Sequence, residues 1–216
     1  MLRSTSIEKP FAHEFYMQSR RISALIAHLK SIPSSPTVTN PYLSATCCDN
    51  LSAYLRELCA TPYSGFLLIG EAPGYLGCAR TGIPFTSEGV LKSSSHYFLK
   101  ALYPSLTLAG SVVERTATFV WDDLSKRGKL PAFWNAFPFH PHCPANSASN
   151  RTPTRLELRH GAPFVFDVIR ILCPHTVVAV GRKAWWALGC RFPRVRHPSF
   201  GGGPQYALQI DALGII

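Results

Sequence analysis

The sequence lacks any segment that would carry the chain into or across a membrane. No apolar run reaches the roughly 18 residues that a membrane-spanning helix requires. Residues 1–10 include Arg3, Glu8 and Lys9 and contain no apolar core of a secretion signal. We therefore expect a soluble, intracellular protein, in the cytoplasm and associated with the nucleoid if the host is bacterial.

Several enzyme signatures are absent as well. Neither G-x-G-x-x-G nor a P-loop occurs, which disfavours a nucleotide-binding enzyme. The H-x-E and P-C-x-x-C zinc signature of base deaminases is also missing. The cysteines are odd in number, scattered and without a C-x-x-C pair, so we predict neither a disulfide framework nor a metal site. His140, His142 and Cys143 lie close together but lack a fourth ligand, so we predict no metal and no cofactor.

Acidic residues are scarce: 12 Asp and Glu stand against 22 Lys and Arg, for a net charge of +10. A cationic surface favours a polyanionic partner, because each phosphate contact releases condensed counterions. The alternative is a basic surface that is only solvated. The length of 216 residues suits one domain with its own core. We predict a single domain over 1–216, with an N-terminal helical part over 1–60 and a catalytic core over 65–203.

Strands alternate with helices along the chain, which predicts an α/β sandwich around a mostly parallel sheet. Two continuous apolar runs end in glycine and suit strands buried on both faces. The expected strands are 66–69, 117–121, 133–137, 176–180 and 194–197, and the expected helices are 14–31, 50–59, 89–103, 155–172, 182–188 and 205–213. Thr154 and Glu157 fit a capping box at the start of 155–172, and Gly161 with Pro163 predicts a break or kink inside it.

Ligands of such folds bind beyond the carboxyl ends of the strands. Three loops leave such ends, and the first covers residues 70–88. Glu71 directly follows a buried strand, so its carboxylate could position water or support a developing cation. It could equally cap a helix or form an ion pair.

The second loop segment covers residues 133–154, and Asn135 lies near the end of the predicted strand with which it begins. Its amide offers an acceptor and two donors in one plane, which match the N3–H and O4 edge of uracil. Cytosine presents the reverse pattern, so a fixed amide would reject it by leaving polar groups unpaired. The alternative is that Asn135 only ties down its own turn.

The third loop covers residues 196–203. His197 can donate a hydrogen bond to an oxygen that gains charge. Ser199 and the glycine amides could bind a phosphate. The alternative is a Pro–Gly turn with a histidine facing solvent.

Together these loops resemble the uracil-DNA glycosylase superfamily. The Gly-Glu-Ala-Pro-Gly segment at 70–74 is similar to its first active-site motif, with the Glu of the thermostable bacterial and archaeal branch. Thr-Gly-Ile-Pro-Phe-Thr at 81–86 is more similar to the single-strand-selective branch, and Asn-Arg-Thr-Pro-Thr at 150–154 to the thermostable one. His-Pro-Ser at 197–199 is similar to the second motif, and the resemblance spans 66–203.

The resemblance implies a fold and a reaction. The fold would be a three-layer α/β/α sandwich with a central, mostly parallel, four-stranded sheet. The reaction would be monofunctional removal of uracil, or a related deaminated base, from DNA by base flipping at the start of base excision repair. We expect a monomer whose partner is DNA. A non-cleaving uracil- or DNA-binding module and a hydrolase of free nucleosides are the rival functions.

The resemblance also implies site residues. Glu71 would orient or activate the attacking water, and His197 would stabilise O2 of the departing uracil. Phe85 would stack on the flipped base and Asn135 would read its edge. Further residues at the base are Gly70, Ala72 and Tyr75, and the predicted DNA contacts are Ser199, Phe200 (a wedge), Gly201, Arg80 and Arg196.

Two departures from the family pattern matter. The thermostable branch carries four cysteines around an iron–sulfur cluster, whereas here Cys47 and Cys48 are adjacent and the others lie far apart, so we predict no cluster. Gly74 stands where the best-known branch has a tyrosine that excludes the thymine methyl group. Tyr75, Leu76 or Phe139 is the candidate for that wall.

Overall fold

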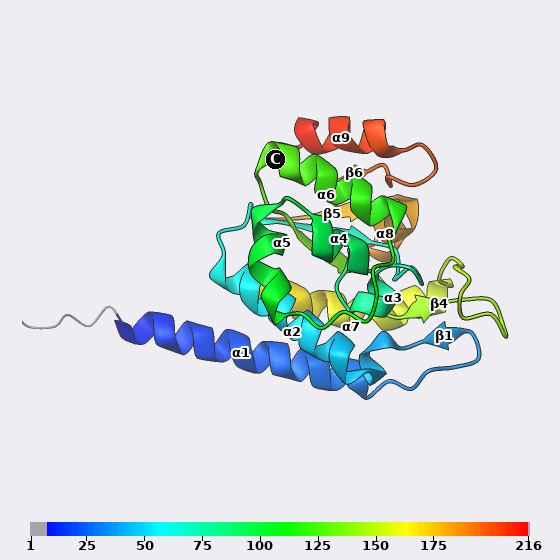
Figure 1. The fold of residues 1–216 in the computed structure, drawn as a ribbon, viewed down its shortest axis with the longest axis horizontal. Helices are drawn as coiled ribbons and strands as arrows, with labels where there is room; N and C mark the ends of the chain where they lie inside the picture. Colours follow the sequence, from blue (N-terminus) through cyan, green and yellow to red (C-terminus); the bar gives the residue numbers. More distant parts are fainter. Residues whose placement is uncertain (1–7, 216) are drawn as a thin grey trace, which may run out of the picture.

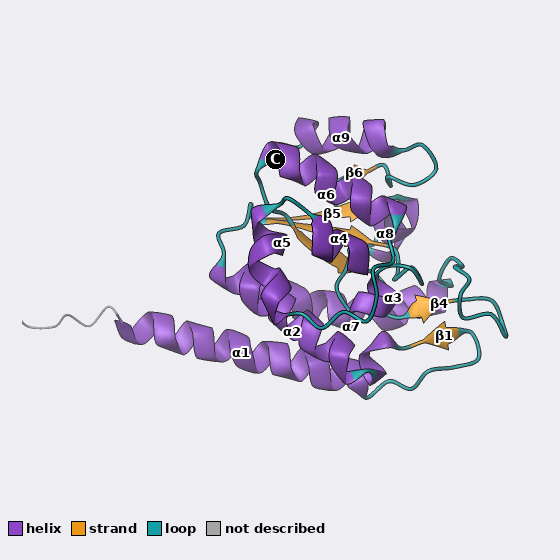
Figure 2. Cartoon of the chain, in the orientation of Figure 1, coloured by secondary structure: helices purple, strands orange, loops and turns teal. Residues whose placement is uncertain are grey.

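The centre of the fold is one parallel sheet of four strands (Figures 1 and 2). The computed structural model describes residues 8–215, so most of the segment examined for a secretion signal lies outside it. No helix in the described part is long and apolar enough to span a membrane. The sheet order is β3-β2-β5-β6, with every neighbouring pair parallel. The strands are β2 (Phe66–Gly70), β3 (Ala132–Asn135), β5 (Thr176–Val180) and β6 (Arg194–Val195).

Helices cover both faces of this sheet (Figure 1). On one side lie α1 (Glu8–Lys30), α2 (Ala45–Ala60) and α7 (Arg155–Leu172), and on the other lie α6 (Arg115–Arg127) and α9 (Gly203–Ala212). The shorter helices are α3 (Cys78–Thr81), α4 (Glu88–Ser93), α5 (Tyr97–Leu102), α8 (Arg182–Ala187) and the 3₁₀ turns Pro41–Leu43 and Tyr103–Ser105. The predicted three-layer α/β/α sandwich is confirmed.

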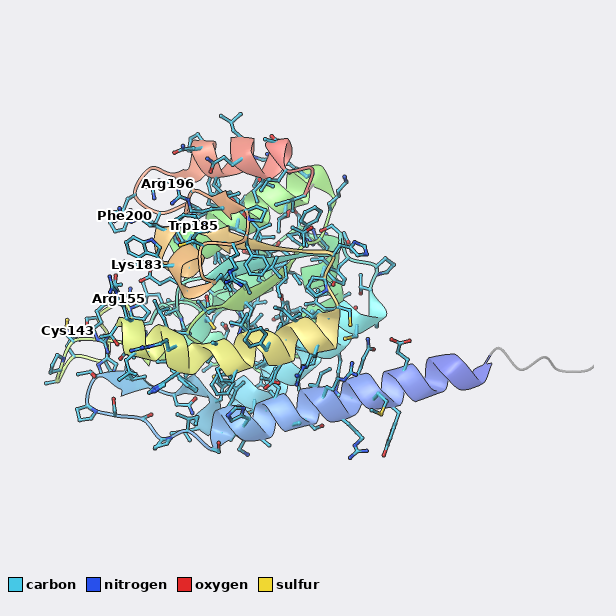
Figure 3. All side chains as sticks on the ribbon, turned by 180° about the vertical axis from the view of Figure 1, so that it is seen from behind. Cys143, Arg155, Lys183, Trp185, Arg196 and Phe200 are labelled. Carbon is cyan, nitrogen blue, oxygen red and sulfur yellow. The ribbon has the colours of Figure 1, made fainter. Side chains whose placement is uncertain are left out.

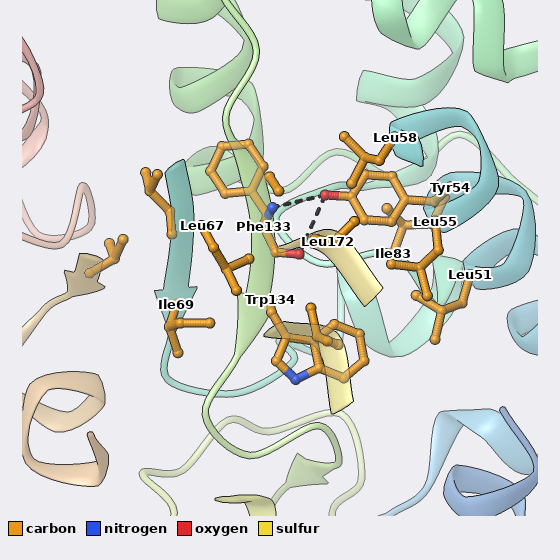
Figure 4. Close-up of a cluster of buried hydrophobic side chains, with 14 of the residues drawn as sticks. Leu51, Tyr54, Leu55, Leu58, Leu67, Ile69, Ile83, Phe133, Trp134 and Leu172 are labelled. Carbon is orange, nitrogen blue, oxygen red and sulfur yellow. Dashed lines mark hydrogen bonds between the residues drawn. The ribbon is translucent and has the colours of Figure 1, made fainter. Parts of the chain in front are cut away.

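The edge strand β3 is closed by a side chain rather than by another strand. The hydroxyl of Tyr54, on α2, accepts from the Phe133 N–H at 2.9 Å and donates to the Phe133 carbonyl at 3.3 Å (Figure 4). Tyr54 is fully buried among apolar side chains. The bonds satisfy backbone groups that an edge strand would otherwise leave unpaired. They also anchor the N-terminal helical part to the strand that ends at Asn135.

Helix α7 begins at the predicted capping box, with the Thr154 and Glu157 side chains each bonded to the other residue's backbone N–H. The predicted break inside it is wrong, because the helix runs through both Gly161 and Pro163. Pro163 is exposed, so water can bond the carbonyl that loses its N–H partner. Gly161 is needed for close packing, since a Cβ there would lie 2.0 Å from the Ala136 carbonyl oxygen.

The strand predicted over 117–121 is also wrong, because these residues lie in α6. The Glu114 side chain caps this helix by accepting from two backbone N–H groups in its first turn. Its buried residues recur at helical spacing: Ala117, Val120, Trp121 and Leu124. The helix predicted over 89–103 is two helices, α4 and α5, separated by a turn at which His96 caps the second.

The polar segments 34–46 and 138–153 contain a short antiparallel pair. It joins β1 (Val38–Thr39) to β4 (His140–Pro141). Arg151 reinforces it by donating to the Thr37 carbonyl at 3.0 Å while it pairs with Glu157. The N-terminal part is therefore joined to the loop that follows Asn135.

Candidate active site

The sheet register brings the first two candidate loops together. Gly70 lies opposite Asn135 at the carboxyl end of the β2–β3 pair. Beyond the strands, the Ala136 N–H donates to the Gly70 carbonyl at 2.8 Å, and the Phe137 N–H donates to that of Glu71 at 3.1 Å. The third loop follows β6 and leaves the sheet at the same carboxyl ends of the strands. Parallel pairing therefore gathers three segments that are distant in the sequence at one end of the sheet.

A cavity of about 150 Å³ lies between these loops. Cavities of about this size admit a single six-membered ring. Its lining includes all four residues to which the sequence assigns central roles, Glu71, Phe85, Asn135 and His197, and also the predicted Ala72. The other lining residues were given no role at the base: Gly74, Gly77, Cys78, Thr86, Glu114 and Thr116. The structure thus brings the four side chains to one cavity.

Phe85 lies on one wall of this cavity, and its backbone conformation is unusual for a residue other than glycine. Its φ is +56°, in the left-handed region that L residues occupy at a cost. The indole N–H of Trp121 holds it there by donating to its carbonyl at 2.9 Å, and its ring packs on Phe133 with centroids 4.9 Å apart. Gly70 leaves room for the ring, since a Cβ there would lie 2.6 Å from it.

Asn135 is buried at the end of β3. Its Nδ2–H donates to the sulfur of Cys78 at 3.8 Å, and a thiol sulfur is a weak acceptor. A Cβ at Gly70 would lie 2.9 Å from its Oδ1, so glycine is required there on this side as well. The amide therefore retains hydrogen-bonding capacity toward a ligand in the cavity.

Glu71 is half-buried at the junction between the cavity and a larger groove. Burial raises the pKa of its carboxyl group, because the charged form loses water. The Thr152 hydroxyl and the Lys183 ammonium group act against this shift. The carboxylate is thus held in a polar but partly dehydrated position, which suits a general base.

His197 has a defined tautomer. The backbone N–H of Ser199 donates to its Nδ1 at 3.1 Å, and the Ser199 Oγ lies 2.8 Å from the same atom. Because a backbone N–H can only donate, Nδ1 is an acceptor and the ring proton lies on Nε2. Burial lowers the pKa of the imidazole, with Glu114 opposing and Arg196 reinforcing the shift. A neutral histidine with a free Nε2–H donor results.

Glu114 is a second carboxylate at the cavity, and the sequence analysis missed it. Its two oxygens accept from the Thr116 and Ala117 N–H groups at 3.0 and 2.8 Å. Reading 117–121 as a strand concealed the cap, although a Glu before a helical apolar pattern is a usable signal. Since both oxygens are engaged, this carboxylate is less free than Glu71 to orient water.

A groove of about 800 Å³ opens from the cavity and shares Glu71 and His197 with it. Three of the predicted DNA contacts, Arg196, Ser199 and Phe200, line it. Its further basic lining residues are Arg151, Arg182, Lys183 and Arg194. Figure 3 shows Lys183, Arg196 and Phe200 at the same end of the molecule.

Other predicted residues lie elsewhere. Arg80 pairs with the buried carboxylate of Glu88 at 3.1 Å and lines neither the cavity nor the groove, so its contact with DNA stays a prediction. A buried carboxylate needs such a counter-charge. Tyr75 also lies outside both linings, with its N–H donated to Asn150 at 3.0 Å. Gly201 follows Phe200 in the same exposed loop at φ +73°.

The candidates for a wall against the thymine methyl group are likewise not at the cavity. Leu76 is absent from its lining, and Phe139 is buried against Phe164 on α7. Gly74 does line the cavity, as do Cys78 and Thr86. A methyl group would therefore meet different neighbours from those that the sequence suggested.

No group of three or more His, Cys, Asp or Glu side chains in residues 8–215 is arranged to hold a metal ion. The ring nitrogens of His140 lie 2.8 Å from the Pro73 carbonyl and 3.0 Å from that of Ser147. This histidine fastens one loop to the other. The seven cysteines are free thiols.

Comparisons with known proteins agree with this architecture. The model of the family described as the uracil DNA glycosylase superfamily matches residues 59–209. Among solved structures, the chain is similar to wild-type SMUG2 of Pedobacter heparinus, with 16% identity and a TM-score of 0.63 over 90% of this chain and 98% of that one. Likeness at that identity shows a shared fold. No curated protein matches the chain.

Proposed function

This chain belongs to the uracil-DNA glycosylase superfamily, and from this we propose that it hydrolyses the N-glycosidic bond of uracil, or of a closely related deaminated base, in DNA. One observation carries the proposal: Glu71, Phe85, Asn135 and His197 surround a single cavity of about 150 Å³. That volume suits one pyrimidine ring and excludes a base pair.

A base inside the helical stack cannot reach such a cavity, so the target nucleotide must leave the stack first. The flipped base then stacks on Phe85, whose ring packs on Phe133 and whose backbone carbonyl is held by Trp121. Asn135 accepts from N3–H and donates to O4. Cytosine presents an acceptor and a donor at these positions, so it would leave the buried amide unpaired.

The reaction breaks the bond between C1′ and N1 and leaves its electron pair on the base. The Nε2–H of neutral His197 donates to O2, where the uracil anion accumulates charge. Glu71 stabilises the cationic sugar and takes a proton from water as the water oxygen bonds to C1′. Uracil leaves as an anion that later takes up a proton, and the DNA retains an abasic site.

The groove beside the cavity supplies the contacts to DNA. Ser199, which lines this groove, binds a backbone phosphate, and Arg196 adds a cation. Phe200 is 98% exposed in the same loop, which suits a side chain that fills the space left by the flipped base.

The function is tested by incubating the protein with labelled oligonucleotides that carry uracil, hypoxanthine, xanthine or a G·T mismatch. Alkali cleavage then scores the abasic sites. We expect strand breaks at uracil and none in the matched oligonucleotide without damage. Tight binding to uracil DNA without abasic sites would support the rival non-cleaving module.

Replacing Asn135 with aspartate should abolish the preference for uracil. The carboxylate is nearly isosteric but can donate no hydrogen bond to O4 when ionised. We expect kcat/KM for uracil to fall by about 10-fold or more, since an unpaired buried polar group costs on the order of 1–3 kcal/mol. Oligonucleotides that present uracil or cytosine report the ratio. Unchanged selectivity would mean that another group reads the base.

Affinity for DNA should fall steeply with added salt because of the +10 net charge and the basic groove. A protein that neutralises several phosphates loses roughly 10³-fold or more between 50 and 200 mM salt. Fluorescence anisotropy with a labelled oligonucleotide measures the slope. A flat response, with cleavage of free deoxyuridine, would favour the hydrolase of nucleosides.

A further inference from the structure

Residues 168–210 contain no aspartate or glutamate. The same stretch holds six basic residues: Arg170, Arg182, Lys183, Arg191, Arg194 and Arg196. Within residues 8–215, none of these six takes part in a salt bridge. The stretch 168–210 is therefore cationic, and none of its six basic residues is neutralised by a salt bridge.

Aromatic side chains are interleaved with these cations. Trp186 on α8 is 46% exposed, whereas the chain's Trp121 and Trp134 are buried. Trp185 is half-buried, and its indole N–H donates to the Phe192 carbonyl at 3.0 Å, which fixes the turn after α8. We call the surface formed by Arg182, Lys183, Trp185, Trp186 and Arg194 the α8 ledge.

The cations of the α8 ledge lie against rings instead of carboxylates. Arg182 and Lys183 lie 5.1 and 5.2 Å from the ring centre of Trp186, and Arg194 lies 4.9 Å from that of Trp185. Such contacts are weak at exposed sites. A phosphate could draw the cations away at little cost, and the exposed Trp186 ring would then be free to stack on a base.

The α8 ledge is continuous with the groove of the candidate active site. Arg182, Lys183 and Arg194 line this groove together with Glu71 and His197. Figure 3 shows Lys183, Trp185, Arg196 and Phe200 on the same end of the molecule. A strand whose nucleotide occupies the cavity would therefore lead directly onto the ledge.

We propose that the α8 ledge binds unpaired bases of the DNA strand that leads away from the active site. One base stacks on Trp186, while Arg182, Lys183 and Arg194 contact the flanking phosphates. The pairing of a basic track with an exposed aromatic side chain is the general design of surfaces for single-stranded nucleic acid. The inference rests on the proposed function only in taking DNA as the ligand.

The test uses uracil-free oligothymidylate, whose binding requires no glycosylase chemistry. Titration should quench tryptophan fluorescence, because Trp186 is the most exposed of the four tryptophans. Trp186→Ala should weaken binding of the single strand about 10-fold, and Trp186→Phe should restore most of it. Neither change alters charge, so the salt dependence should stay the same. Arg182→Ala should instead reduce the salt slope by about one.

Two results would overturn the proposal. One is single-strand affinity within twofold of the parent protein in Trp186→Ala. The other is an equal loss on a blunt, fully paired duplex, whose bases cannot stack on a side chain outside the helix. Uracil excision is assayed in parallel to separate the two proposals. If the parent protein excises no uracil but Trp186→Ala loses single-strand affinity, the proposal for the α8 ledge holds and the proposed function fails. If the parent protein excises uracil but Trp186→Ala keeps its single-strand affinity, the proposal for the α8 ledge is wrong.

Discussion

Replacing His197 with alanine should lower kcat for uracil excision by about 100-fold or more, which is typical of the loss of one oxyanion donor. The Ser199 N–H fixes the imidazole with its proton on Nε2, and burial lowers its pKa, so the ring is neutral at physiological pH. A neutral donor gains most when O2 becomes negative in the transition state. Single-turnover assays on a uracil oligonucleotide measure the loss.

Ser199→Ala provides the comparison for this variant. It removes the hydroxyl but keeps the backbone N–H that selects the tautomer, so we expect a smaller loss in kcat than for His197→Ala. Affinity for undamaged DNA should be the same for the His197→Ala and parent proteins. A rate within tenfold of the parent would assign the charge stabilisation to another group.

Glu71→Gln should reduce kcat by on the order of 100-fold or more, with little change in affinity for uracil DNA. The amide keeps the size of the side chain but can neither take a proton from water nor offset a cationic sugar. Single-turnover rates at saturating enzyme isolate the chemical step, and equilibrium binding is measured separately. Equal turnover by the two proteins would remove Glu71 from the mechanism.

Glu114→Gln is the matched control, because this carboxylate faces the same cavity but is engaged by two N–H groups at the start of α6. Glutamine retains one acceptor oxygen for this cap. We therefore expect a lower thermal stability and a much smaller loss in kcat than for Glu71→Gln. The reverse order would identify Glu114 as the residue that activates water.

The pH profile provides a second readout for Glu71. Its raised pKa means that the active carboxylate form is lost at a higher pH than for an ordinary glutamate as the solution is acidified. The rate should fall on the acid side through that raised pKa. The lowered pKa of His197 keeps the imidazole neutral to a lower pH than an ordinary histidine. Glu71→Gln should remove from the acid limb the part that the Glu71 carboxyl group causes.

Local pattern was sufficient for much of the fold. The apolar runs before Gly70 and Gly181 are strands because they are buried on both faces, and the capping box at Thr154 marks the start of α7. These signals lie within a few residues of the elements that they specify. The order of the three loops along the chain, together with their small and polar residues, indicated where the chemistry lies.

The local sequence pattern gave a wrong prediction where a short apolar segment fits both the period of a strand and the period of a helix. The segment 117–121 is apolar and short, so it fits a strand as well as the face of α6, and the Glu114 cap decided in favour of helix. Because of the same ambiguity, the sequence analysis missed Glu114 at the cavity. The pairing of Arg80 with Glu88 could not be predicted for a different reason, since Glu88 is held by backbone N–H groups of the distant segment 110–112.

By itself, the sequence determined the α/β class, the family and four of the side chains that line the cavity: Glu71, Phe85, Asn135 and His197. Only the tertiary structure decided that Cys78, Thr86 and Glu114 share this cavity, that Tyr75 does not, and that α8 extends the groove with exposed cations and a tryptophan. Motifs record what each loop contains, whereas parallel strand register and helix packing set which atoms meet. Those contacts join residues far apart in the chain, so no local pattern encodes them.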